Sequence, residues 1–266
     1  MKIQAFNPFL PSYEYIPDAE PYVFGSRVYV YGSHDRFDGE DFCMNDYVCW
    51  SAPIDDLGAW KKERVIYRSV QDPLNEDGTQ HLFAPDVQVG EDGRYYLFYC
   101  LHRSSTVSVA VCDEPAGEYQ FYGHIRYADG ILYGQKQGDV FNFDPGVLKD
   151  DDGRIYLYTG LSYLKDAPMR KYLAGMFQID GSYCVELDKD MLTLKSEPVL
   201  AVPGEVLAEG TDFEGHGFFE ASSPRKINGR YYMIYSSVKS HDLCYAVSES
   251  PVKGFRYGGI IVSIGD

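Results

Sequence analysis

Hydrophobic residues occur along the chain in short β-favouring runs, and glycine-containing turns separate these runs. The clearest pair of runs flanks Asn228-Gly229, where both residues tolerate the positive φ of a tight two-residue hairpin turn. Residues 231–235, which follow this turn, are apolar at successive positions and predict a strand buried on both faces. No segment predicts a helix. The same hairpin layout occurs three more times, around Gly25, Gly93 and Gly153.

The four hairpins form a repeat, with steps of 68, 60 and 76 residues between successive turn glycines. A repeat of this length with several strands per unit is typical of a β-propeller, in which the innermost strands line a central axis. We therefore predict an all-β fold, a β-propeller with about four blades in this chain. Because the repeat crosses every candidate boundary, we expect a single domain over residues 1–266.

Shorter β-favouring stretches predict further strands at 46–57, 60–67, 106–115, 174–180 and 183–188. Between them, the polar segment 68–80 is expected to be a linker, and residues 116–139 a loop. The basic segment 161–173 is interpreted as a surface loop, although it could also overhang a site.

An acidic residue precedes the first strand of each hairpin. Asp18 and Asp86 lie seven residues before the turn glycine, and Asp144 and Glu220 lie nine before it. Inner strands of a propeller begin at the same face, so these four acids are expected to converge. For any one acid, capping of a loop through an Asx-turn is an equal alternative, which the fourfold recurrence weakens.

Two carboxyl groups that flank a glycosidic bond can hydrolyse it. A protonated carboxyl gives its proton to the leaving oxygen, and an ionised one activates water or attacks the sugar. Phe218 and Phe219 precede Glu220, and apolar neighbours are expected to raise the pKa of its carboxyl. Asp18, beside a polar loop, suits the ionised role. Asp144 is predicted to orient the acid and to keep its pKa high through like-charge proximity.

Composition narrows the possible partners and compartments. The net charge of −16 argues against nucleic acid or an anionic membrane as a partner. Aromatic residues make up 15%, which suits buried strands and also stacking on sugars. No stretch reaches the ~20 apolar residues of a membrane span, and no signal peptide is evident, so we expect a cytoplasmic protein. The six cysteines show no metal-binding spacing and are expected to be reduced thiols.

Other site motifs are weaker. Asp150, Asp151 and Asp152 precede Gly153, but the EF-hand spacing and its final glutamate are missing, so a tight turn is the better interpretation. No GxSxG or HExxH motif occurs. Three histidines, His34, His81 and His216, lie close enough to predicted inner strands to reach the site, although a structural role is the more common one. We predict no metal ligands.

These segments together resemble glycoside hydrolase family 43. The resemblance is carried by the segments NPFLPSYEYIPDAEPYVFGSRVYVYGSHD, FAPDVQVGEDGRYYLFY, FDPGVLKDDDGRIYLYTG, FFEASSPRKINGRYYMIYSS and LCYAVSESPVKGF, which span nearly the whole chain in the expected order. It implies a five-bladed β-propeller that hydrolyses β-xylosides, α-L-arabinofuranosides and arabinans with inversion.

The resemblance also implies roles for single residues. Asp18 corresponds to the general base, Asp144 to the residue that tunes and orients the acid, and Glu220 to the general acid. Inversion implies that the carboxyls of Asp18 and Glu220 stand about 6.5–9.5 Å apart. Around them, we expect the substrate site to include Asp86, His34, Phe83, Phe219 and His216.

One departure concerns the fifth blade, whose turn glycine is expected at 289–305, beyond Asp266. In the family this blade usually supplies a histidine that helps to hold a metal, often calcium, and an arginine that reaches the site. We therefore expect either a chain truncated at its C-terminal side or a four-bladed variant, with no required cofactor. Its open propeller edges are expected to favour homo-oligomers.

We predict an inverting, exo-acting hydrolase that releases xylose or arabinose from plant cell-wall oligosaccharides. An alternative is a propeller that binds glycans without turnover because the fifth blade is missing. Another five-bladed sugar enzyme, such as a fructosidase, is a further alternative that the absence of an early NDPNG-type motif disfavours.

Overall fold

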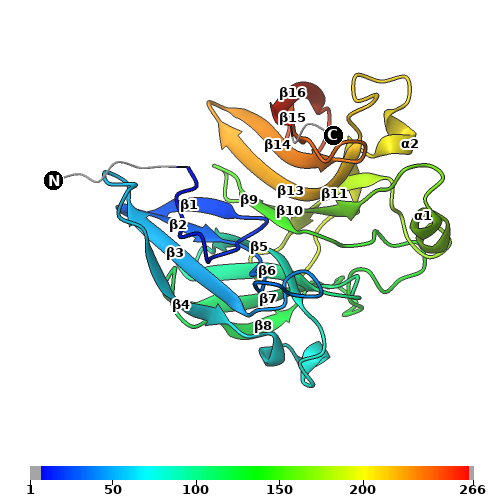
Figure 1. The fold of residues 1–266 in the computed structure, drawn as a ribbon. Coiled ribbons are helices and arrows are strands. Elements are labelled where there is room, and N and C mark those ends of the chain that lie inside the picture. Colours follow the sequence, from blue (N-terminus) through cyan, green and yellow to red (C-terminus); the bar gives the residue numbers. More distant parts are fainter. Residues whose placement is uncertain (1–6, 264–266) are drawn as a thin grey trace. The chain divides into compact units, whose positions relative to one another are not determined.

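The structure, a computed structural model, describes residues 7–263. Within them, sixteen strands form four sheets of four strands, and hydrogen-bonded neighbours follow chain order in every sheet (Figure 1). Such a four-stranded meander is the blade of a β-propeller, so the four predicted blades are present. We call them the first sheet (β1–β4), the second sheet (β5–β8), the third sheet (β9–β12) and the fourth sheet (β13–β16).

The chain divides into two compact units. One comprises Met1–Arg103 with Ser108–Gly123, and the other comprises Ser104–Val107 with His124–Asp266. Apart from the ends of β7 and β8, the first unit holds the first and second sheets, and the second unit holds the third and fourth. The single domain over residues 1–266 stays a prediction.

The strands of the first unit are β1 (Glu20–Phe24), β2 (Arg27–Tyr31), β3 (Tyr47–Pro53), β4 (Lys61–Tyr67), β5 (Leu82–Val89), β6 (Tyr95–Leu101), β7 (Val107–Cys112) and β8 (Gln120–His124). Its core is rich in buried tyrosine, and each of these hydroxyl groups finds a partner. The hydroxyls of Tyr67 and Tyr99 lie 2.7 Å apart, and Tyr99 donates to the buried carboxylate of Asp72. Asp72 also caps the short 3₁₀ helix η2 (Pro73–Asn75), which follows η1 (Ser69–Gln71) in the segment predicted as a linker.

The strands of the second unit are β9 (Gly146–Lys149), β10 (Ile155–Leu161), β11 (Gly181–Leu187), β12 (Val199–Pro203), β13 (Phe218–Ile227), β14 (Arg230–Ser237), β15 (Leu243–Ser248) and β16 (Arg256–Val262). A core cluster joins side chains of the third and fourth sheets, such as Tyr158, Phe218 and Tyr235. Asp150, in the β9–β10 turn, accepts from Tyr231 at 2.6 Å and pairs with Lys226, and this pairing ties the two sheets together.

Three predictions of secondary structure were wrong. Residues 174–180 form turns and not a strand, and the fourth strand of the third sheet is β12 instead. The predicted loop 116–139 contains β8, since pairing within the sheet overrides its glycine-rich composition. Residues 7–263 include two short α-helices, α1 (Pro168–Leu173) and α2 (Glu205–Ala208), and α1 lies in the basic segment 161–173. Pro168 at the first helical position favours the start of α1 there.

The hairpin turns are as predicted. All four turn glycines have positive φ, between 61° and 85°, and Asn228 has φ 51° beside Gly229 at 79°. This left-handed pair makes the two-residue turn between β13 and β14, and it fixes their register from Ile227 and Arg230 onward. The turn glycines that define the repeat are therefore required by the positive φ of the hairpin turns.

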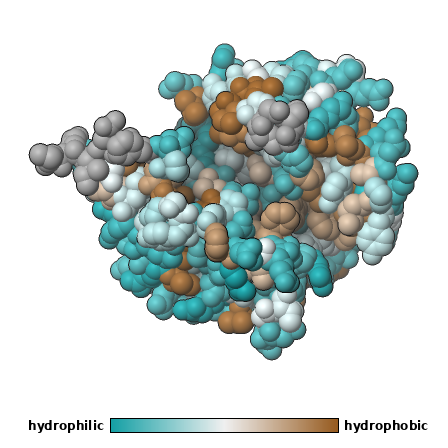
Figure 2. Space-filling view, viewed as in Figure 1, coloured by the Kyte–Doolittle hydropathy of each residue, from teal (hydrophilic) through white to brown (hydrophobic). Residues whose placement is uncertain are grey.

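Burial differs between the sheets. Every residue of β10 is buried, as is nearly every residue of β6, whereas β14 alternates between buried and half-buried positions. The prediction that residues 231–235 are buried on both faces was therefore wrong. The outermost strand of this sheet, β16, is the most exposed, and hydrophobic residues gather on the surface near it (Figure 2). No helix among residues 7–263 is long and apolar enough to cross a membrane.

Candidate active site

The four predicted acids lie at the first strand of each sheet. Asp18 and Asp144 each stand two residues before their strands, β1 and β9, as predicted. Asp86 lies inside β5 and Glu220 inside β13, because strand pairing in these two sheets begins earlier than the sequence indicated. Register shifts occur at both positions, and such bulges re-aim side chains near functional sites.

Within the second unit, Asp144 contacts the residue that follows Glu220. The backbone nitrogen of Ala221 donates a hydrogen bond of 3.1 Å to Oδ2 of Asp144. Asp144 is only 5% exposed. Both Asp144 (φ 45°) and Ala221 (φ 63°) adopt the left-handed conformation that non-glycine residues rarely take. Such strain persists where the surrounding structure enforces it, which is common at functional sites.

Aromatic rings pack around Phe219, the residue before Glu220. Phe219 packs edge-on against Tyr163, with ring centroids 5.8 Å apart, and against His241 at 4.9 Å. Burial raises the pKa of Tyr163, and the negative charge of Glu220 raises it further, which places this charge near the phenol. The raised pKa that was expected for Glu220 stays a prediction.

Asp18 also has a left-handed backbone, with φ 54°. Its side chain is accessible to solvent, yet protein atoms crowd the carboxyl so that desolvation raises its pKa above the ordinary value. A hydrogen bond of 3.1 Å from Oγ of Ser33 works in the opposite direction, and the charge of Asp35 raises the pKa further. The carboxyl of Asp18 is thus reachable by water and at the same time partly desolvated by neighbouring protein atoms.

Ser33 was not predicted, although it holds Asp18 in place. Its Oγ accepts a hydrogen bond of 2.8 Å from the nitrogen of Ala84 in β5 and donates to Asp18. Ser33 is fully buried. A lone serine after β2 carries no motif, so its role follows only from the pairing of distant strands.

Asp86 lies deeper than the other acids, at 1% exposure. Its Oδ1 accepts from the hydroxyl of Tyr22 at 2.6 Å and from the nitrogen of Val87 at 2.7 Å. In this arrangement Asp86 fixes Tyr22 of β1 against β5. Its predicted supporting role at the substrate site stays a prediction.

The other predicted substrate residues are partly buried side chains with structural contacts. His34 is hydrogen-bonded through Nδ1 to the carbonyl of Asp46, and its Nε2 lies 3.6 Å from Glu14. Phe83 packs edge-on against His102 with a centroid distance of 5.5 Å. His216 stacks on Tyr257 with centroids 4.5 Å apart and planes at 6°.

Comparison with known proteins gives consistent results. Residues 7–253 match the family described as "Glycosyl hydrolases family 43". A "Xylosidase/arabinosidase" of Thermoclostridium stercorarium is 57% identical over 263 residues, which are 99% of this chain and 53% of that protein. A "Beta-xylosidase" of Xylanibacter ruminicola is 32% identical over 94% of this chain and 80% of its own length. This chain thus spans about half of the first relative and four fifths of the second.

Solved structures share the fold. A structure described as "RS223-Beta-xylosidase" is 25% identical with a TM-score of 0.72, over 94% of this chain and 79% of its own. The GH43_1 enzyme from Xanthomonas citri complexed with xylose has the same identity and TM-score, over 94% of this chain and 74% of its own. The predicted all-β propeller fold is confirmed.

Proposed function

Because the chain belongs to glycosyl hydrolase family 43, we propose that it is a glycosidase with Glu220 as general acid, Asp144 as the group that positions it, and Asp18 as general base. The observation that carries this proposal is the hydrogen bond from Ala221 to Asp144, which ties the segment that bears Glu220 to a second carboxylate. The two acids come from different sheets and are 76 positions apart in sequence.

The proposed roles follow from the surroundings of each carboxyl. A general acid must hold its proton near working pH, and a nearby like charge favours the protonated form. Asp144, held at the nitrogen of Ala221, places such a charge close to the strand residue Glu220. Phe219, the residue before Glu220, packs edge-on against Tyr163, and this gives the acid an apolar surface on one side.

A general base works best with a pKa raised toward the operating pH while it stays ionised there. The crowding around Asp18 raises its pKa, and the hydroxyl of Ser33 limits this rise. In the proposed reaction, Asp18 takes a proton from water as the water attacks the anomeric carbon. Glu220 gives a proton to the departing oxygen, so the anomeric configuration inverts.

The proposed substrates are short plant cell-wall oligosaccharides that end in β-xylose or α-L-arabinofuranose. The names of the relatives support this choice, since those proteins are described as xylosidases and arabinosidases. The partly buried aromatic side chain of Phe219 offers a stacking surface for a sugar. The acid–base chemistry uses carboxyl groups of the chain, and we propose that hydrolysis needs no cofactor.

Hydrolysis of nitrophenyl β-xyloside and nitrophenyl α-L-arabinofuranoside tests the proposal. Wild type is expected to turn over at least one of them, and Glu220→Gln and Asp18→Asn are each expected to lower kcat by at least about 10²-fold. Glu249→Gln, at an exposed position directly after β15, serves as the matched control and is expected to retain full activity.

Two results would contradict the proposal. Glycan binding without hydrolysis in any variant would indicate a binding propeller, the alternative considered from the sequence. Release of a product that keeps the substrate's anomeric configuration, observed by NMR immediately after hydrolysis, would exclude the inverting mechanism.

We also propose that the chain works in a reducing compartment, the cytoplasm. None of its six cysteines, all of which the structure describes, forms a disulfide, and five of the six are buried. In secreted proteins, cysteines are commonly oxidised to disulfides.

Self-association is a further part of the proposal. Phe9, Val23, Ile54 and Leu57, on one face of the first sheet, are between 45 and 61% exposed. They line an apolar pocket of about 620 Å³. We call the exposed surface that these four residues form the bare apolar face. Exposed apolar patches commonly mark interaction sites, and a second copy of the chain through a two-fold axis is the simplest occupant.

A further inference from the structure

A histidine pair closes the open end of the β5–β6 hairpin. Leu82 pairs with Leu101 at the ends of these strands, and the next residues outward are His81 and His102. The nitrogen of His102 donates a hydrogen bond of 2.9 Å to the carbonyl of His81, so the two residues stand directly opposite each other. Side chains at such positions share a face of the sheet, and the two imidazole centroids are 5.6 Å apart.

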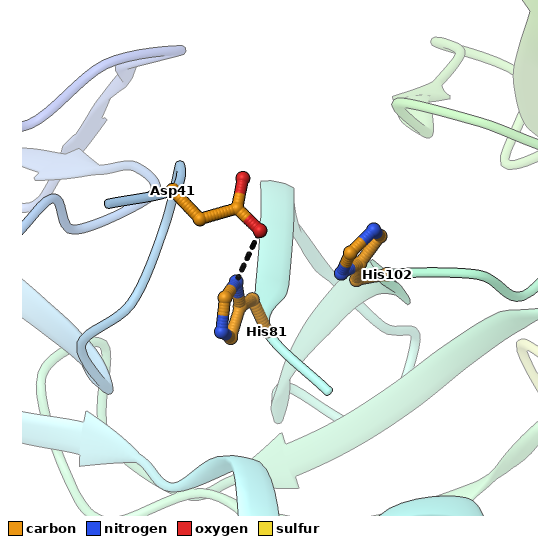
Figure 3. Close-up of side chains that lie close together, drawn as sticks. All are labelled: Asp41, His81 and His102. Carbon is orange, nitrogen blue, oxygen red and sulfur yellow. Dashed lines mark ion pairs between the residues drawn. The ribbon is translucent and has the colours of Figure 1, made fainter. Parts of the chain in front are cut away.

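Asp41 approaches this pair from the loop between β2 and β3 (Figure 3). Its Oδ1 accepts a hydrogen bond of 2.8 Å from the nitrogen of the next residue, Phe42. Its Oδ2 lies 3.8 Å from Nδ1 of His81. That distance is too long for a hydrogen bond, and the same Nδ1 is inaccessible to solvent and has no hydrogen-bond partner.

Ligand atoms of all three residues lie within 4.8 Å of one another. We propose that Asp41, His81 and His102 bind a divalent transition-metal ion, with Zn²⁺ as the fitting example, and that water completes its coordination. Three protein ligands and a water are a common zinc arrangement, with Zn–N distances near about 2.0–2.1 Å. Two imidazoles disfavour Ca²⁺ and Mg²⁺, which prefer oxygen ligands.

The charges around the cluster allow a cation. Asp41 contributes a negative charge, and the chain as a whole carries −16. Arg103 follows His102 and opposes the charge of the ion. Asp41 is 44% exposed at its side chain, so a small movement brings its carboxylate to the two imidazoles, which stay fixed by the hairpin.

Such an ion would join the β2–β3 loop to the start of β5. Phe83, which packs on His102, and Ala84, which donates to Ser33, come directly after the cluster in sequence. The ion would therefore brace the strand end that supports the hydroxyl beside Asp18. This role is structural, and it does not depend on the proposed hydrolysis.

Titration calorimetry of the chain, without a polyhistidine tag and after chelator treatment, tests the site with Zn²⁺ alone. We expect one Zn²⁺ per chain, and affinity at least about 10-fold weaker in His81→Gln and in His102→Gln. His124→Gln, in β8, is the matched control and should bind like wild type. Binding of Co²⁺ to wild type should give visible absorption bands that both histidine variants lose.

Absence of stoichiometric binding by wild type would overturn the proposal. Wild-type affinity in either histidine variant, or an equal loss in His124→Gln, would do the same, because the ion would then lie elsewhere. Asp41→Asn changes an exposed side chain and covers the case in which a histidine variant fails to fold. Its affinity should also fall at least about 10-fold, and wild-type affinity there would count against the site.

Discussion

Gly146 lies against Ser222 so closely that a Cβ atom on the glycine would be 2.0 Å from the carbonyl oxygen of the serine. The two residues belong to β9 and β13, the first strands of their sheets. Each stands two positions after a proposed catalytic-site acid, Asp144 and Glu220 respectively. The absence of a side chain at Gly146 therefore sets how near these two strands can come.

Gly146→Ala is expected to separate β9 from β13 and to misalign the two acids. Overpacking of this kind costs about 1–3 kcal/mol of folding stability, and a displacement of about 1 Å in an active site can lower kcat about 10²-fold. Gly175→Ala is the matched control, because a Cβ there meets no atom within 4 Å. Wild-type kcat in Gly146→Ala would show that the close approach does not position the acids.

Asp144 contributes both a charge and a hydrogen-bond acceptor, and two substitutions separate these effects. Asn keeps an oxygen that can accept from the nitrogen of Ala221 and tolerates φ 45° well. Ala loses the acceptor and is strained at this φ. We expect kcat to fall about 10-fold or more in Asp144→Asn and further in Asp144→Ala. Equal kinetic losses in the two variants would contradict a positioning role for the hydrogen bond.

Ser33→Ala is expected to shift the pH profile. The hydroxyl of Ser33 lowers the pKa of Asp18, so its removal raises this pKa. A base with a higher pKa loses its ionised form at a higher pH, and the acidic limb of kcat/KM should therefore move to higher pH. Ser196→Ala, in the other unit, removes a hydroxyl that accepts a hydrogen bond from the backbone nitrogen of Glu186. The pH profile of this control variant should match that of wild type. An unmoved limb in Ser33→Ala would remove Asp18 from the role of base.

Asp18→Asn is expected to lose activity and gain stability at neutral pH. Burial raises the pKa of Asp18 in the folded chain, so the folded state binds this proton more tightly than the unfolded state. The ionised carboxylate therefore costs stability at pH values above its folded pKa, and the cost disappears as the pH falls through its ordinary value. Thermal unfolding should show a higher Tm for the variant at pH 7 and a smaller difference near pH 3. A lower Tm at pH 7 would contradict this account.

The sequence revealed the blades because their turns demand special residues. Asn228 and the four turn glycines adopt positive φ, and few other residues do so without strain. Such turn residues can be recognised in the sequence without knowledge of the tertiary structure. The acids that recur before each turn can be recognised in the same way. The strand predicted at 174–180 failed although its composition suits a strand, because its only β-pairing within residues 7–263 is an isolated bridge between Gln178 and Val140.

The supports of the site could not be predicted in the same way. Ser33 reaches Ala84 across 51 positions, and His81 meets Asp41 across 40, with no spacing rule that connects them. His81 was considered for the substrate site, whereas the structure places it at the candidate metal cluster. Such pairs depend on which strand ends lie together, and that is a property of the assembled sheets.

The bare apolar face gives the last prediction. Val23→Lys places a charge on this face, and burying an unpaired charge against a second copy would cost far more than the contact gains. We expect wild type to sediment as a dimer at micromolar concentration and Val23→Lys to sediment as a monomer with the same circular dichroism. Val70→Lys, at an exposed valine of η1, is the matched control and should remain dimeric. A monomeric wild type, or a dimer that survives Val23→Lys, would show that this face is not the contact.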